Sequence, residues 1–162
     1  MMTVTHSHHL KGLLATALGV VVLALIAAPS GAAGKKKTET LRVFSKVQTF
    51  TFTTADGNVS HQPPAGPPQA GDALEVDSLD FKGDHKRHSK RPIGSDYTHC
   101  TFVADSQEPD CFGYAALGGS LLRFHGLDII GGTGRYEGVT GTIPKDKEVP
   151  GGSDVVVKLH VK

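Results

Sequence analysis

Hydrophobic residues occupy every second position in short segments of the chain after residue 40. In the last segment, for example, Val155, Val157, Leu159 and Val161 share one face. No segment in this part keeps a helical period, so the pattern predicts β-strands. The predicted strands are Leu41–Thr54, Asp72–Phe81, Tyr97–Ala104, Cys111–Leu117, Ser120–Ile130, Glu137–Ile143 and Asp154–Val161. About seven or eight short strands separated by turns form an antiparallel barrel or a sandwich, and the pattern alone leaves both open.

The alternation changes phase inside two of the predicted strands. In the first strand the phase shifts between Val47 and Phe50, and in the second it shifts between Val76 and Leu79. The first shift predicts a β-bulge, as strands that bend around a small barrel often need. Between these strands, His61–Gly71 holds four prolines and two glycines and is predicted to be an extended linker outside the sheet.

The start of the chain has the pattern of an export signal. Leu13–Ala28 is an apolar run without charge, too short for a comfortable membrane span, and small residues follow it up to Ala33. We therefore predict a signal peptide over residues 1–33, cleaved near Ala33, and a secreted, extracellular protein; an uncleaved anchor is the alternative. Residues 34–40 are expected to be a basic, flexible N-terminus, and residues 41–162 a single domain.

Charge and cysteine content narrow the function classes. Residues 34–162 contain sixteen acidic and sixteen Lys or Arg residues, so this part is formally neutral and is not expected to bind nucleic acid. The chain has no Trp for stacking on single strands. Cys100 and Cys111 both fall in the exported part, where a disulfide between them is expected. A free catalytic cysteine is the alternative.

Glycines are concentrated in Ile130–Gly141, which holds five of them in twelve residues. The spacing does not fit a nucleotide site, because Glu137 stands where a dinucleotide fingerprint needs its third glycine and Tyr136 where a phosphate loop needs its second. A tight corner between two strands is therefore predicted. Its expected structural residues are Gly131, Gly132, Gly134, Tyr136, Gly138 and Gly141.

This glycine-rich corner resembles the GGTGxYxGaxG signature of dirigent proteins and allene-oxide-cyclase-like barrels. The resemblance implies that the chain is a bacterial secreted member of this family. The resemblance extends over roughly 71–143. It implies an all-β, calycin-type fold, a small antiparallel eight-stranded barrel over residues 41–162. The other matching stretches are Gly71-Asp72 with Asp77-Ser78-Leu79, similar to the family's GD…DxL strand, and Cys100–Leu117 with Gly118-Gly119, similar to the stretch before its GG-turn.

The resemblance also implies a function. Members of this family hold a small apolar or phenolic molecule in the barrel and guide its cyclisation or stereoselective coupling without a cofactor. If this chain is an enzyme, we expect a cofactor-independent isomerase or cyclase, and family members often associate as homodimers or homotrimers. A non-catalytic carrier with the same cavity, or a cell-surface interaction module with a filled interior, are the alternatives.

Candidate site residues come from the predicted strands. A carboxylate or phenol inside a barrel can move a proton, since burial shifts its pKa towards neutrality. Asp77 matches the family's DxL strand, while Asp80 lies on the other face by parity. Solvent-facing or core-edge positions are the alternative for every candidate. The catalytic candidates are Asp77, Tyr97 and Tyr114, and the ligand-binding candidates are His99, Arg123 and His125.

Basic residues and histidines are frequent in the loop Lys82–Gly94. His85 and His88 alone are weak evidence for a metal, because a site wants three or four convergent ligands, and none is predicted. The positive charge predicts contact with an anionic cell surface, which salt would screen, and a solvated hairpin loop is the alternative. Hydrolase and protease motifs are absent from the sequence.

Overall fold

The computed structural model describes residues 37–104 and 108–161, so the predicted signal peptide lies outside the described residues. In these two ranges no helix is long and apolar enough to cross a membrane. The elements are β1 (Lys37–Thr53), β2 (Val59–Ser60), β3 (Ala73–Asp84), β4 (Arg87–His88), β5 (Gly94–Thr101), β6 (Asp110–Leu117), β7 (Ser120–His125), β8 (Asp128–Gly132), the 3-10 helix η1 (Gly134–Tyr136), β9 (Thr140–Val149) and β10 (Gly152–Val161).

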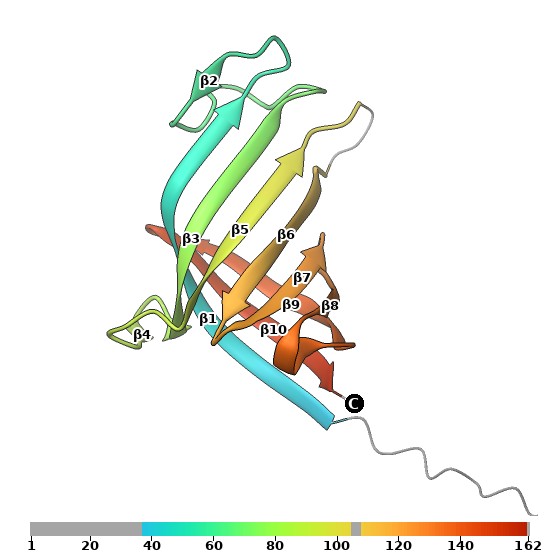
Figure 1. Cartoon of the computed structure of the whole chain (residues 1–162). Coiled ribbons are helices and arrows are strands. Elements are labelled where there is room, and N and C mark those ends of the chain that lie inside the picture. The colour runs from blue at the N-terminus through green and yellow to red at the C-terminus, as the bar shows by residue number, and fades with distance from the viewer. Residues whose placement is uncertain (1–36, 105–107, 162) are drawn as a thin grey trace, which may run out of the picture. The chain divides into compact units, whose positions relative to one another are not determined.

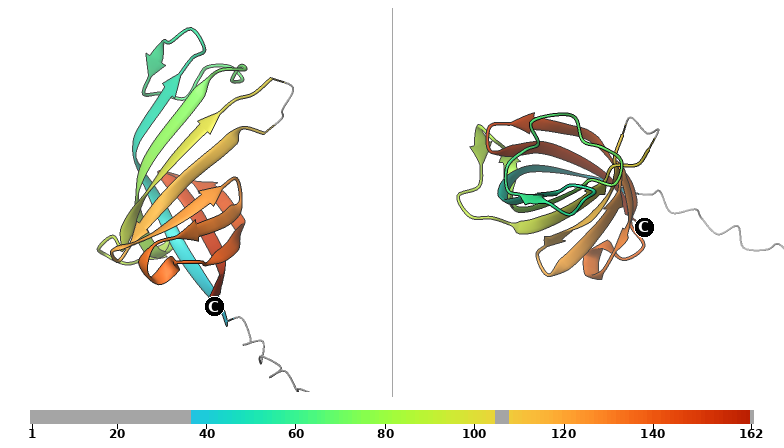
Figure 2. Two further views of the ribbon diagram at one scale, coloured as in Figure 1. Left: turned by 45° about the vertical axis from the view of Figure 1, so that its right-hand side comes forward. Right: turned by 90° about the horizontal axis from the view of Figure 1, so that it is seen from above.

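The strands form a closed antiparallel barrel of eight strands, in the order β1-β10-β9-β8-β7-β6-β5-β3 and back to β1 (Figures 1 and 2). The two short strands β2 and β4 extend the sheet outside this ring. Closure depends on β1, which pairs with β10 along Lys37–Lys46 and with β3 along Val43–Thr53. The all-β barrel that the resemblance implied is confirmed, and the sandwich is excluded.

The bulge predicted in β1 is confirmed. The register of β1 against β3 shifts between Val47 and Thr49, so Gln48 is the extra residue. β3 itself pairs with β5 without a shift. Its phase change therefore has another cause: Phe81 lies on the outer face, where its ring contacts those of Phe44 at 6.3 Å and His88 at 5.0 Å.

Strand β1 starts earlier than the sequence indicated. Residues 37–40, expected to be part of a flexible N-terminus, pair with the last residues of β10, from Val161 to Lys158. The alternating apolar residues of β10 face inward, and Leu159 is 0% exposed. Because β10 extends to Val161, residues 37–40 find backbone hydrogen-bond partners on it and continue strand β1.

The apolar core fills the part of the barrel built from β6 to β10. The helix η1 closes this part, with Tyr136 packed against the inward-facing side chains. Burying these residues is the main stabilising contribution. The buried cluster consists of Leu117, Leu122, Ile129, Tyr136, Val139, Val157 and Leu159.

The glycine-rich corner lies between β8 and β9 and contains η1. Gly134 has φ +59°, and a Cβ there would stand 2.6 Å from the hydroxyl oxygen of Ser120. A Cβ on Gly132 would stand 2.1 Å from the carbonyl oxygen of Leu121. Both positions therefore require glycine. The other motif glycines are Gly131 and Gly138, with positive φ, and Gly141, which faces the carbonyl oxygen of Lys158.

The expected disulfide joins Cys100 on β5 to Cys111 on β6, which stand directly opposite each other. This pairing is confirmed. We expect the double variant Cys100→Ser/Cys111→Ser to lose about 2–3 kcal/mol of unfolding free energy, because the bond closes a short loop and constrains the unfolded chain. Urea unfolding of the variant and of the oxidised protein measures the difference, and equal midpoints would show that the bond contributes nothing.

Candidate functional site

Two carboxyl groups face the interior of the barrel, from Asp80 on β3 and Asp96 on β5. Asp80 stands opposite Gly94, which stands opposite the core residue Leu117. Asp96 stands opposite Ala115, which packs against the same core. Since residues opposite one another in a sheet share a face, both acids point inward. Asp80 is 3% exposed.

The two acids form a hydrogen-bonded pair with Ser45 of β1. The Ser45 hydroxyl donates to Oδ2 of Asp96 at 2.6 Å, and the side chains of Asp80 and Asp96 hydrogen-bond to each other. Burial, together with the charge and the hydrogen bond of the neighbouring Asp96, raises the pKa of Asp80 to about 8. Asp80 therefore holds a proton at neutral pH and donates it in the hydrogen bond to Asp96.

The inner face around this pair carries both apolar side chains and the hydroxyl groups of Ser45 and Ser78. Register places the core residues Leu117 and Leu122 on one side. Further along the inner face, towards β2, Phe52 and Leu74 are opposite each other, with Val76 and Ser78 between Leu74 and Asp80 on β3. A neutral carboxylic acid in such a place can donate a hydrogen bond or a proton to an oxygen of an apolar ligand.

The six residues predicted for the site are placed on the outer face instead. Asp77 stands opposite Tyr97, Tyr97 opposite Tyr114, and Tyr114 opposite Arg123. This row alternates with the inward-facing row of Asp96, because β3 and β5 pair without a bulge. None of these side chains therefore shares a face with Asp80. The remaining predicted residues, His99 and His125, lie on the outer face in the next row.

The outer-face residues have partners of their own. The Tyr97 hydroxyl donates to Glu75 at 2.9 Å, and Nδ1 of His99 lies 3.3 Å from the same carboxylate. Nε2 of His125 lies 2.6 Å from Asp110. The structure does bring Tyr97, Tyr114 and Arg123 together around a shallow outer hollow of about 250 Å³. This hollow also contains Phe112, Leu121, Phe124 and Ile130.

Sequence reasoning missed Asp96 and Ser45 and preferred Asp77 to Asp80. A signal for the inward-facing acids is present in parity: Asp80 shares its parity with Leu74, and Asp96 with Cys100, which is buried. The shift to Leu79 and Phe81 obscured this signal, because it made the outer face look apolar. The hairpin that covers Phe81 could not be foreseen from the alternation.

The loop with the two histidines is a folded hairpin. Asp154 accepts hydrogen bonds from the backbone N–H and from Nδ1 of His85, both at 2.7 Å. The ring of His88 packs on Phe44 and Phe81. His85 and His88 thus have different neighbours, and the described residues contain no cluster of three or more His, Cys, Asp or Glu that could hold a metal.

The chain is similar to solved structures of two pterocarpan synthase dirigent proteins. GePTS1 shares 14% identity with it, over 79% of this chain and 92% of that one, with a TM-score of 0.49. PsPTS1 shares 16% identity, over 80% of this chain and 97% of that one, with a TM-score of 0.48. No protein-family model and no curated protein matches the chain. The roles of Asp80 and Asp96 therefore rest on the geometry of this chain alone.

Proposed function

We propose that the protein is a barrel that binds a small apolar or phenolic molecule, and that Asp80 supplies a proton while the molecule cyclises or couples. The observation that carries this proposal is the carboxyl group of Asp80, which is buried on the inner face, is hydrogen-bonded to Asp96 and has its pKa raised to about 8 mainly by burial. A buried acid with a strongly raised pKa is typical of functional sites.

The two acids divide the chemistry between them. When a ligand binds, the single O–H of Asp80 would turn from Asp96 to an oxygen of the ligand and donate a hydrogen bond, or its proton, where negative charge develops. Once Asp80 has lost its proton, two carboxylates stand side by side in an apolar interior, and their repulsion favours the return of a proton to Asp80. The apolar side chains around the pair would hold a flexible ligand in one conformation and so lower the entropic barrier to ring closure.

The site is proposed to act outside the cell. The apolar run Leu13–Ala28 and the disulfide between Cys100 and Cys111 both support export. The native protein is therefore expected in the culture medium of its host, with a mass that corresponds to a start near Gly34. A full mass that still includes Met1 would overturn cleavage.

Native mass spectrometry of protein purified from its own host tests binding and chemistry together. We expect the wild type to retain a small apolar or phenolic molecule, and Asp80→Asn to retain the unconverted precursor. The matched control is Asp77→Asn, which alters an exposed acid of the same strand and should behave as wild type.

The outcomes separate the alternatives. If Asp80→Asn carries the same molecule as the wild type, the barrel is a carrier and the proton-donor role of Asp80 is wrong. If neither protein carries an added mass, and a panel of fatty-acid, polyketide and phenolic compounds does not bind, small-molecule binding is overturned.

A further inference from the structure

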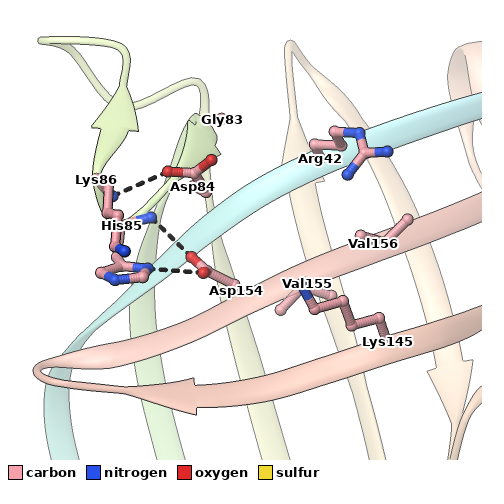
Figure 3. Close-up of a pocket in the computed structure, with 9 residues that line it drawn as sticks. All are labelled: Arg42, Gly83, Asp84, His85, Lys86, Lys145, Asp154, Val155 and Val156. Atoms are coloured by element: carbon pink, nitrogen blue, oxygen red, sulfur yellow. Dashed lines mark hydrogen bonds and ion pairs between the residues drawn. The ribbon is translucent and has the colours of Figure 1, made fainter.

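The outer face of the barrel has a second hollow, of about 230 Å³, on the far side of the sheet from the acid pair (Figure 3). Its floor is formed by β1, β10 and β9, and one wall is the hairpin formed by the end of β3 and β4. Three cationic side chains surround it: Arg42 from β1, Lys145 from β9 and Lys86 from the hairpin. Three separate elements thus bring positive charge to one place.

Register fixes the geometry of the floor. Arg42 stands opposite Val156, and Val156 stands opposite Lys145, so the two cations flank one apolar residue on a shared face. Neighbouring strands lie about 5 Å apart, which puts the Cα atoms of Arg42 and Lys145 about 10 Å from each other. Their side chains are long enough to reach an ion that sits above Val156.

Two carboxylates, of Asp84 and Asp154, also line the hollow and accept hydrogen bonds from N–H donors, and Asp154 lies close enough to Lys145 for their charges to attract. Both oxygens of Asp154 accept from His85, one from its backbone and one from its ring. Oδ1 of Asp84 accepts from the backbone N–H groups of Lys86 and Arg87, each at 2.9 Å. Within residues 37–104 and 108–161, the described ion pairs involve none of the three cations of the hollow.

The same contacts hold the wall in place. Besides the bonds to Asp154, the ring of His88 packs against Phe44 and Phe81, and the backbone N–H of Ser89 donates to the carbonyl oxygen of Lys82 at 2.9 Å. The hairpin is therefore docked on the barrel, and Lys86 is presented at a fixed place. A preformed site of this kind loses less entropy when it binds an ion than a flexible basic loop does.

We propose that this hollow binds a phosphate group carried by an anionic polymer. Each phosphate within a polymer carries one negative charge spread over two non-bridging oxygens, and the guanidinium of Arg42 can bind both of them at once. The exposed residues Arg87, Lys90 and Arg91 continue the positive charge along the hairpin, so the next phosphates of a chain would meet them.

Isothermal titration calorimetry of the full chain with linear polyphosphate and with inorganic phosphate tests this site. Arg42→Gln and Lys145→Gln are each expected to weaken polyphosphate binding about tenfold or more, because each removes charge-assisted hydrogen bonds. The matched control is Lys158→Gln, an exposed residue of β10 outside the hollow, which should change the affinity less than about twofold. Thermal unfolding of every variant checks that the fold is kept.

The two ligands separate the sources of phosphate. Stronger binding of polyphosphate than of inorganic phosphate, falling with added salt, supports a polymer that spans the hollow and the hairpin. Equal binding of the two ligands would overturn the polymer and leave a site for a single phosphate. Equal losses in Lys158→Gln and Arg42→Gln would show that only the net charge matters, and absence of binding would overturn the site. None of these results affects the proposal for Asp80.

Discussion

Replacing Tyr136 by alanine is expected to lower the unfolding free energy by about 3–5 kcal/mol, as large aromatic deletions in cores do. Tyr136 is 3% exposed and packs with Leu122, Ile129 and Val139 at the end of the barrel that η1 closes. The truncated side chain would leave a cavity that the rigid glycine corner cannot fill. Domains of this size are stable by only about 5–15 kcal/mol, so much of the protein would unfold.

The chain has no Trp, so urea unfolding followed by far-UV circular dichroism is the suitable measurement. Tyr136→Phe is the matched control, because it keeps the ring and removes only the hydroxyl. We expect it to cost less than about 1.5 kcal/mol, the typical value of one hydrogen bond. A loss below about 1 kcal/mol in Tyr136→Ala would contradict the packing role. An equal loss in both variants would assign the effect to the hydroxyl.

Short-range features of the fold could be predicted because they depend on neighbouring residues. The phase change between Val47 and Phe50 marks a bulge, which the register shift confirms. The disulfide between Cys100 and Cys111 follows from their place on two strands that pair across a short loop. In both cases the physical constraint acts within one strand or one hairpin.

Long-range features could not be predicted in the same way. The alternation does not show that β1 pairs with both β10 and β3, and these two pairings close the barrel. Nor does it show that the hairpin of β3 and β4 covers Phe81. An outward-facing aromatic residue therefore looks like a change of phase in the alternation. The choice of Asp77 over Asp80 rests on the resemblance to the family's DxL strand, and the alternation offers no check on it. An inward-facing and an outward-facing acid of one strand differ only in what covers each face, and the sequence of the strand does not contain that information.

The second large effect is expected from Asp80→Asn, and it depends on pH. The pKa of Asp80 is raised from its ordinary value of 3.8 to about 8 in the folded protein, mainly by burial. Between these values the unfolded chain releases the proton and the folded protein keeps it. Stability attributable to Asp80 is therefore fully present below pH about 4 and is lost as pH rises towards 8. One pKa unit corresponds to about 1.4 kcal/mol, so the total loss is at most on the order of 6 kcal/mol.

Asparagine has the shape of a neutral aspartic acid and still offers N–H donors to Asp96, but it cannot ionise. We expect Asp80→Asn to match the wild type at pH 4 and to exceed its stability by a few kcal/mol at pH 8. Urea unfolding at pH 4, 6 and 8 measures the two curves, with Asp77→Asn as the control that should follow the wild type. Parallel curves for Asp80→Asn and wild type would show that Asp80 is ionised in the folded protein. The proton-donor role would then lose its basis.

A gain in stability at neutral pH would also bear on function. The wild-type protein would then carry an ionisable acid that lowers its stability. This acid stands at a buried position where an uncharged residue is more favourable. Sites that are less stable than they could be are typical of places where activity requires an unfavourable group. If Asp80→Asn is both more stable at pH 8 and unable to convert the bound molecule, the loss of activity cannot come from unfolding. It must then come from the missing proton.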